Sequence, residues 1–233
     1  MNLLTRFIIL GALLLAPVLR AADSFEGRIT MTMTPSNGKI MTINQTIKGH
    51  VLRIDTAGME GGVIMDMDAR TMTILLMKQK AYMVRPMPTA EDVRSKAAEA
   101  GRTEHDTDVE DTGKTDTILG YKCHQFLVKD GDKVTELWIA PALGTFAGLG
   151  QQGGGNPFGR SRSSETAAKW ERVFKGKAGY PMRVITHDAS GAQTFKLEVT
   201  NVQKGGIMDA DVAPPPDFKP FQMPNIPGMN FGG

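Results

Sequence analysis

The chain has 233 residues, of which 41% are hydrophobic and 22% are charged, with 27 Lys+Arg against 25 Asp+Glu. This composition is typical of a globular protein and excludes a disordered chain or a membrane protein with several spans. The single cysteine excludes an internal disulfide and a zinc site with four thiolate ligands.

The first 22 residues have the pattern of a secretory signal. One basic side chain near the start is followed by an apolar run at residues 7–19, which is too short for a comfortable membrane span. We therefore expect an exported protein, periplasmic or secreted, without a stable membrane span in its mature form. Without Arg6 and Arg20 the 27 basic side chains become 25, equal to the 25 acidic ones. A neutral chain without a basic stripe predicts no nucleic-acid partner.

After the signal, alternation of apolar and polar residues predicts antiparallel strands with one apolar face. In residues 25–34, for example, Ile29, Met31 and Met33 share one face, and mainly threonines occupy the other. Clusters of Gly, Pro, Asn and Asp separate such segments and predict tight turns. Six strands are expected by residue 86, at residues 25–34, 40–48, around 52–54, 63–67, 72–76 and 81–85.

The second half of the chain predicts further strands and three short helices. A hydroxyl cap at Thr89 and acids in the next turn predict a helix at residues 89–100, and Pro141 begins another that extends to residue 149. Residues 166–175 predict a third helix, which carries Trp170 and Phe174 on one side. The acidic segment 104–116 is typical of a solvated edge strand. Two hairpins are expected, at residues 121–140 and 180–202.

The predicted organisation is a signal at residues 1–22, one domain at 23–205 and a proline-rich extended tail at 206–233. Within the domain, the glycine-rich residues 150–160 predict a mobile loop. Proline cannot donate a backbone hydrogen bond, so the tail is not expected to join a central strand.

No pattern in the sequence predicts an enzyme. The four histidines lie far apart, and adjacent Cys123 and His124 would point to opposite faces of a strand. Residues 148–153 fit the dinucleotide pattern G-x-G-x-x-G, but they lack the strand before it, the helix after it and the parallel sheet that this motif needs. We therefore expect no catalytic residue, no metal site and no cofactor.

Methionine is the unusual feature of the sequence. Ten of the fifteen methionines fall between Met31 and Met87. One interpretation is that they are core residues that fill gaps, and another is that they line an adaptable apolar cavity. A third interpretation is Cu(I) binding by pairs two residues apart, Met31 with Met33 and Met65 with Met67, since thioethers are soft ligands.

Several short segments in a fixed order support a family resemblance. They are Phe25-Glu26-Gly27, Ile64-Met65-Asp66, Lys80-Ala81-Tyr82, residues 118–123 and residues 136–140, followed by a final hairpin and a proline-rich tail with Phe218. This order resembles the bacterial exported family of domain of unknown function 4412, which is related to the periplasmic lipoprotein carriers (LolA/LolB-like). The resemblance implies a curved antiparallel sheet, with helices over its concave apolar face, where the carriers hold acyl chains.

The expected fold is therefore mainly β (α+β), a curved antiparallel sheet or half-barrel of 10–11 strands with two or three short helices covering its concave face. The expected function is non-enzymatic binding of an apolar ligand, lipid or lipoprotein-like, in a methionine-rich cavity. The alternatives are a structural or protein-interaction module with a filled core, and periplasmic Cu(I) handling. The candidate lining residues are Ile29, Met31, Met33, Met41, Ile43, Met65, Met67, Met72 and Ile74, with Trp170 and Phe174 as a helical cover. The oligomeric state is not predicted.

Overall fold

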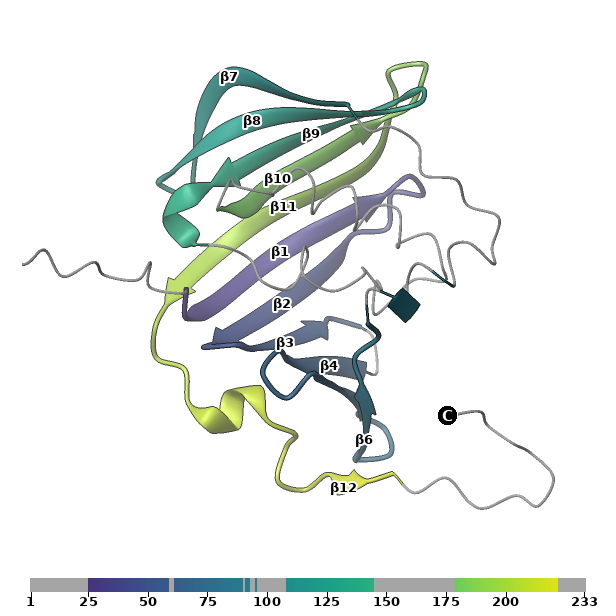
Figure 1. The fold of residues 1–233 in the computed structure, drawn as a ribbon, viewed down its shortest axis with the longest axis vertical. Helices are drawn as coiled ribbons and strands as arrows, with labels where there is room; N and C mark the ends of the chain where they lie inside the picture. The colour runs from purple at the N-terminus through teal and green to yellow at the C-terminus, as the bar shows by residue number, and fades with distance from the viewer. Residues whose placement is uncertain are drawn as a thin grey trace, which may run out of the picture.

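A computed structural model describes residues 25–58, 61–89, 91–92, 95, 108–144 and 179–221. These residues form one open, curved sheet of twelve strands in the order β12-β6-β5-β4-β3-β2-β1-β11-β10-β9-β8-β7 (Figure 1). The strands are β1 (Gly27–Pro35), β2 (Met41–Lys48), β3 (Val51–Thr56), β4 (Gly61–Asp66), β5 (Thr71–Leu76), β6 (Ala81–Pro86), β7 (Asp108–Ile118), β8 (Tyr121–Asp130), β9 (Lys133–Ala140), β10 (Tyr180–His187), β11 (Gln193–Lys204) and β12 (Lys219–Pro220).

The predicted strands and both predicted hairpins are confirmed. All neighbouring strands pair antiparallel except β12, which pairs parallel with β6. The count is twelve rather than 10–11 because two residues of the tail form β12 at the outer edge. That position agrees with the prediction that the proline-rich tail cannot enter a central strand. The acidic strand β7 forms the opposite edge, as predicted from its charge.

The prediction of two or three helices covering the concave face is not supported by the described residues. They contain two short 3-10 helices, η1 (Pro141–Leu143) and η2 (Asp209–Val212), and helical residues at 91, 92 and 95. The predicted cap at Thr89 is present, since its hydroxyl accepts a hydrogen bond from the N–H of Asp92 at 3.1 Å. The helix at Pro141 is shorter than predicted because Gly144 takes a φ of 70°. The predicted helix at 166–175 and loop at 150–160 lie outside the described residues.

The main core lies on one face of the central strands. Ile29 and Met31 of β1 and Leu52 and Ile54 of β3 are buried there, and η1 contributes Leu143 at one end of the cluster. A second cluster is formed by side chains from β8, β9 and β10, namely Phe126, Val128, Leu137, Ile139 and Val184. The alternation predicted from the sequence therefore produces the buried face.

Residues 205–221, here called the strap, run past one end of β1–β3, at the face opposite the main core, and pair with β6 (Figure 1). Arg28 and Arg53 alternate with the buried residues of their strands and so point to this face. Arg28 pairs with Asp211 at 2.9 Å, and the Arg53 guanidinium donates to the carbonyl of Ala213 at 3.2 Å. At the far end Lys80 pairs with Asp217 at 2.9 Å. The tail is thus fixed along the sheet by charged and backbone contacts.

Candidate functional site

The strand register brings most of the candidate lining residues together on one face. Met31 lies directly opposite Ile43, and Met33 lies opposite Met41, in the β1–β2 pair. Residues that face each other across a strand pair project their side chains from the same side of the sheet. The first two strands therefore present a row of thioether and aliphatic side chains.

The same face continues without interruption to β5. Leu52 of β3 lies opposite both Ile47 of β2 and Met65 of β4. Met65 in turn lies opposite Met72 of β5, and Val63 lies opposite Ile74. We call this face of β1–β5 the methionine face; its members from the sequence prediction are Ile29, Met31, Met33, Met41, Ile43, Met65, Met72 and Ile74.

Burial divides the methionine face into two kinds of residue. Ile29, Met31 and Ile43 are buried, with Ile29 at 0% exposure, and belong to the core cluster. The remaining five are half-buried: Met33, Met41, Met65, Met72 and Ile74. Met67 does not lie in β4, because the strand ends at Asp66 and Met67 enters the following turn. Trp170 and Phe174 lie outside the described residues.

Two polar side chains, Gln45 of β2 and Thr56 of β3, interrupt the apolar face. The Tyr180 hydroxyl donates to the Gln45 side-chain oxygen at 2.6 Å, and both residues are buried. Burial raises the pKa of Tyr180 well above its usual range, so the hydroxyl stays protonated as a donor. The Thr56 hydroxyl is buried and has no hydrogen-bond partner in the part of the chain that the structure describes. The sequence suggested no role for any of these three residues, which only the assembled sheet brings into the core.

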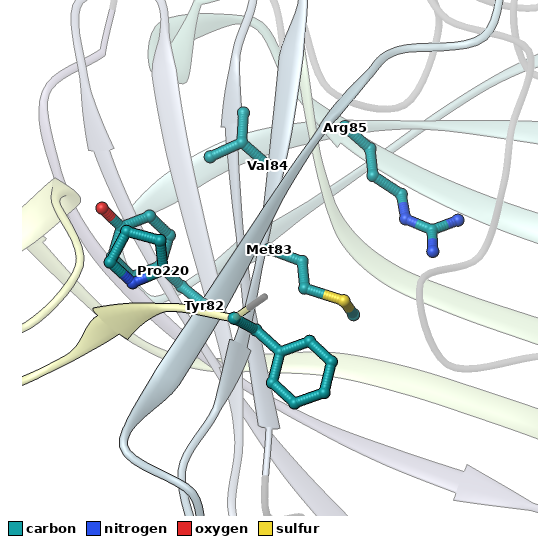
Figure 2. Close-up of a pocket in the computed structure, with 6 residues that line it drawn as sticks. Tyr82, Met83, Val84, Arg85 and Pro220 are labelled. Carbon is teal, nitrogen blue, oxygen red and sulfur yellow. The ribbon is translucent and has the colours of Figure 1, made fainter. Parts of the chain in front are cut away.

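A pocket of about 250 Å³ lies at the edge of the sheet between β6 and β12. Its lining residues are Tyr82, Met83, Val84, Arg85, Pro220 and Phe221 (Figure 2). Met83 lies directly opposite Ile74 of β5, so the pocket adjoins the methionine face. The sequence prediction missed this pocket because its two walls come from segments far apart in the chain. Met83 is one of the ten methionines between Met31 and Met87, and this concentration was the one sign of the pocket in the sequence.

The metal-ligating and thiol groups of the described residues are dispersed or buried. No three or more His, Cys, Asp and Glu side chains gather among them as a metal site would require. Cys123 is buried, and this burial raises the pKa of its thiol, which disfavours the nucleophilic thiolate. No helix in the described ranges is long and apolar enough to cross a membrane.

The fold and its apolar face define the class as an open antiparallel sheet with a methionine-rich side. The chain belongs to the family of domain of unknown function DUF4412, whose model matches residues 25–218. This match confirms the resemblance seen in the sequence and extends beyond the predicted domain end at residue 205 to include most of the strap. No curated protein matches the chain.

Several solved structures are similar in fold. An uncharacterized conserved protein from Thermus thermophilus has 10% identity and a TM-score of 0.50, with 86% of this chain and 91% of that chain covered. The MucA/MucB complex of Pseudomonas aeruginosa gives 12% identity and a TM-score of 0.46, with 84% and 58% covered. An outer membrane lipoprotein-sorting protein domain, described as putative, from Vibrio parahaemolyticus gives 9% identity and a TM-score of 0.33, with 82% and 90% covered. At these identities the likeness to the Thermus protein concerns the fold alone.

Proposed function

We propose that this protein is an exported, non-enzymatic binding protein that holds an apolar ligand, a lipid or lipoprotein acyl chain, against the methionine face. One observation carries the proposal: the register places eight apolar candidate side chains on one face, and five of them are only half-buried. A ligand that covers them would remove more apolar surface from water, and each Å² so buried stabilises the complex by about 25 cal/mol. Met33, Met41, Met65 and Met72 have flexible side chains that can adapt to chains of different shape.

Displacement of a fluorescent apolar dye by fatty acids tests this proposal. The half-buried pair Met65–Met72 is the most informative target, because the two side chains lie directly across from each other. We expect Met65→Ser with Met72→Ser to weaken fatty-acid binding about tenfold or more, because both polar side chains replace apolar contact area. Met208→Ser is the matched control, since Met208 is 66% exposed and lies in the strap. Equal binding by both variants and the unaltered chain, or no binding by any of them, would refute the proposal.

A structural or protein-interaction module is the second candidate, and it is favoured by the buried part of the face. Ile29, Met31 and Ile43 are already covered by the protein itself. If the whole face is filled core, fatty acids displace no dye from the unaltered protein at any concentration. In that case the Met65–Met72 substitutions lower only the free energy of unfolding, and a protein partner becomes the expected ligand.

A further inference from the structure

The pocket between β6 and β12 combines an apolar wall with a cationic rim. Figure 2 shows Met83 and Arg85 on one side of β6 and Val84 on the other. Phe221 follows Pro220, whose strand partner is Tyr82, so alternation places the Phe221 ring on the side of Met83. The N–H of Phe221 donates to the carbonyl of Tyr82 at 2.7 Å, which fixes this ring beside the strand. The wall and the rim therefore face the same space.

Arg85 differs from three other arginines in the described part of the chain. Arg28, Arg53 and Arg183 each pair with a carboxylate, at 2.9, 2.8 and 2.8 Å respectively. Arg85 is exposed and has no ion pair with any described residue. Its guanidinium carries five donors in a planar fork that matches a carboxylate in two parallel hydrogen bonds. The rim thus offers a charge that no described carboxylate balances.

The apolar path from this rim leads onto the methionine face. Arg85 lies opposite Met72, and Met83 lies opposite Ile74, so both are direct neighbours of half-buried members of that face. A volume of about 250 Å³ is slightly below the roughly 300–1,000 Å³ of complete small-molecule sites. The pocket therefore fits one end of a longer molecule whose remainder extends along the sheet.

Building on the proposed function, we propose that the ligand is an anionic amphiphile with a single acyl chain and a carboxylate head. The carboxylate binds the guanidinium of Arg85, and the chain lies on Met83 and Phe221 and extends toward Ile74. A singly charged head is preferred because Arg85 is the one charged side chain among the described residues that line the pocket. A doubly charged phosphate would leave one negative charge without a partner at this rim.

The test compares laurate with dodecanol, which has the same chain length and no charge, as ligands of the full chain in dye displacement. We expect the unaltered protein to bind laurate about three- to fivefold more tightly than dodecanol, which is the range of an exposed ion pair. Arg85→Gln should remove that preference and leave dodecanol binding unchanged. Added salt should weaken laurate binding by the unaltered protein and have little effect on Arg85→Gln.

Lys122→Gln is the charge-matched control, because Lys122 is exposed on β8, in the other half of the sheet. It should leave the affinities for both ligands unchanged. Equal laurate binding by Arg85→Gln and the unaltered chain would overturn the head-group assignment. If laurate and dodecanol bind equally and the Met65–Met72 substitutions weaken both, the proposed function stands and this inference fails. If neither binds, both fail.

Discussion

At the scale of single residues, the sequence predicted the apolar face well and its polar interruptions poorly. Strict alternation in β1 placed Ile29, Met31 and Met33 on one side, and the register confirms it. The assignment of Met67 to the same strand face required β4 to extend one residue further than it does. Gln45 follows the same alternation but is polar, so only its contact with Tyr180, far away in sequence, explains its burial.

The Tyr180–Gln45 hydrogen bond should contribute measurably to stability. Tyr180→Phe leaves the buried Gln45 oxygen without this donor, and we expect the free energy of unfolding to fall by about 1–3 kcal/mol. Urea titration of the full chain measures the change, with Tyr121→Phe as control because Tyr121 is only half-buried. Combining Tyr180→Phe with Gln45→Leu should restore part of the loss, since both polar groups are then removed. A change below about 0.5 kcal/mol for Tyr180→Phe would contradict this account.

Copper binding by the methionines is a separate prediction at this scale. Met65 and Met67 do not share a strand, whereas Met65 lies opposite Met72, so the pairing expected from the sequence is only partly available. We expect a variant with Met31, Met33, Met65 and Met67 all changed to Leu to bind Cu(I) as weakly as the unaltered chain. Competition with a Cu(I) chelator measures the affinity. A marked loss of copper affinity in that variant would favour the copper hypothesis over lipid binding.

At the scale of elements, the tail shows what sequence patterns leave open. The prolines predicted an extended segment barred from central strands, and β12 does lie at the outer edge. The path of the tail could not be predicted, because it depends on pairs such as Arg28–Asp211 and Lys80–Asp217 between segments distant in sequence. Of the predicted helices, the one that begins at Pro141 is shorter than expected, since η1 ends at Leu143. The predicted helix at residues 166–175 lies outside the described residues and stays a prediction.

The attachment of the strap should depend on pH. The hydrogen bond from the N–H of Met208 lowers the pKa of Asp211, and the charge of Arg28 lowers it further. The Lys80 ammonium lowers the pKa of Asp217. A carboxyl with a lower pKa in the folded state stabilises that state above its unfolded pKa, and the contribution is lost as pH falls through the folded value. The ordinary pKa of these carboxyls is about 4. We therefore expect the strap to detach only when the pH falls below that value.

Hydrogen exchange of the Phe221 amide, which donates to Tyr82, measures this detachment. Its protection should fall on acidification before that of the central strands, and Asp217→Asn should lower it already at neutral pH. Asp188→Asn is the control, because Asp188 accepts bonds from Ser190 and Ala192 within its own hairpin turn. Protection of Phe221 that is independent of pH and of Asp217 would show that the strap is held by other contacts.

At the scale of the whole molecule, the sequence predicted six strands in the first part of the chain and two hairpins in the second, but not how the two parts join. Alternation determines which face of a strand is apolar, whereas it does not determine the neighbouring strand. The joint is the pairing of β1 with β11, for example Met31 opposite Val199 and Met33 opposite Leu197, which makes β1 a central strand between the two halves (Figure 1). This joint extends the methionine face toward β11 and leaves β12 and β7 as the edges of the sheet.

The central claim is that the methionine face binds an apolar ligand, and native mass spectrometry of the purified full chain tests it most directly. The account predicts a second species, heavier than the protein by the mass of a lipid or acyl chain. That species should be lost after solvent extraction and regained on addition of laurate. A single species of protein mass that gains nothing from added fatty acid would contradict the claim.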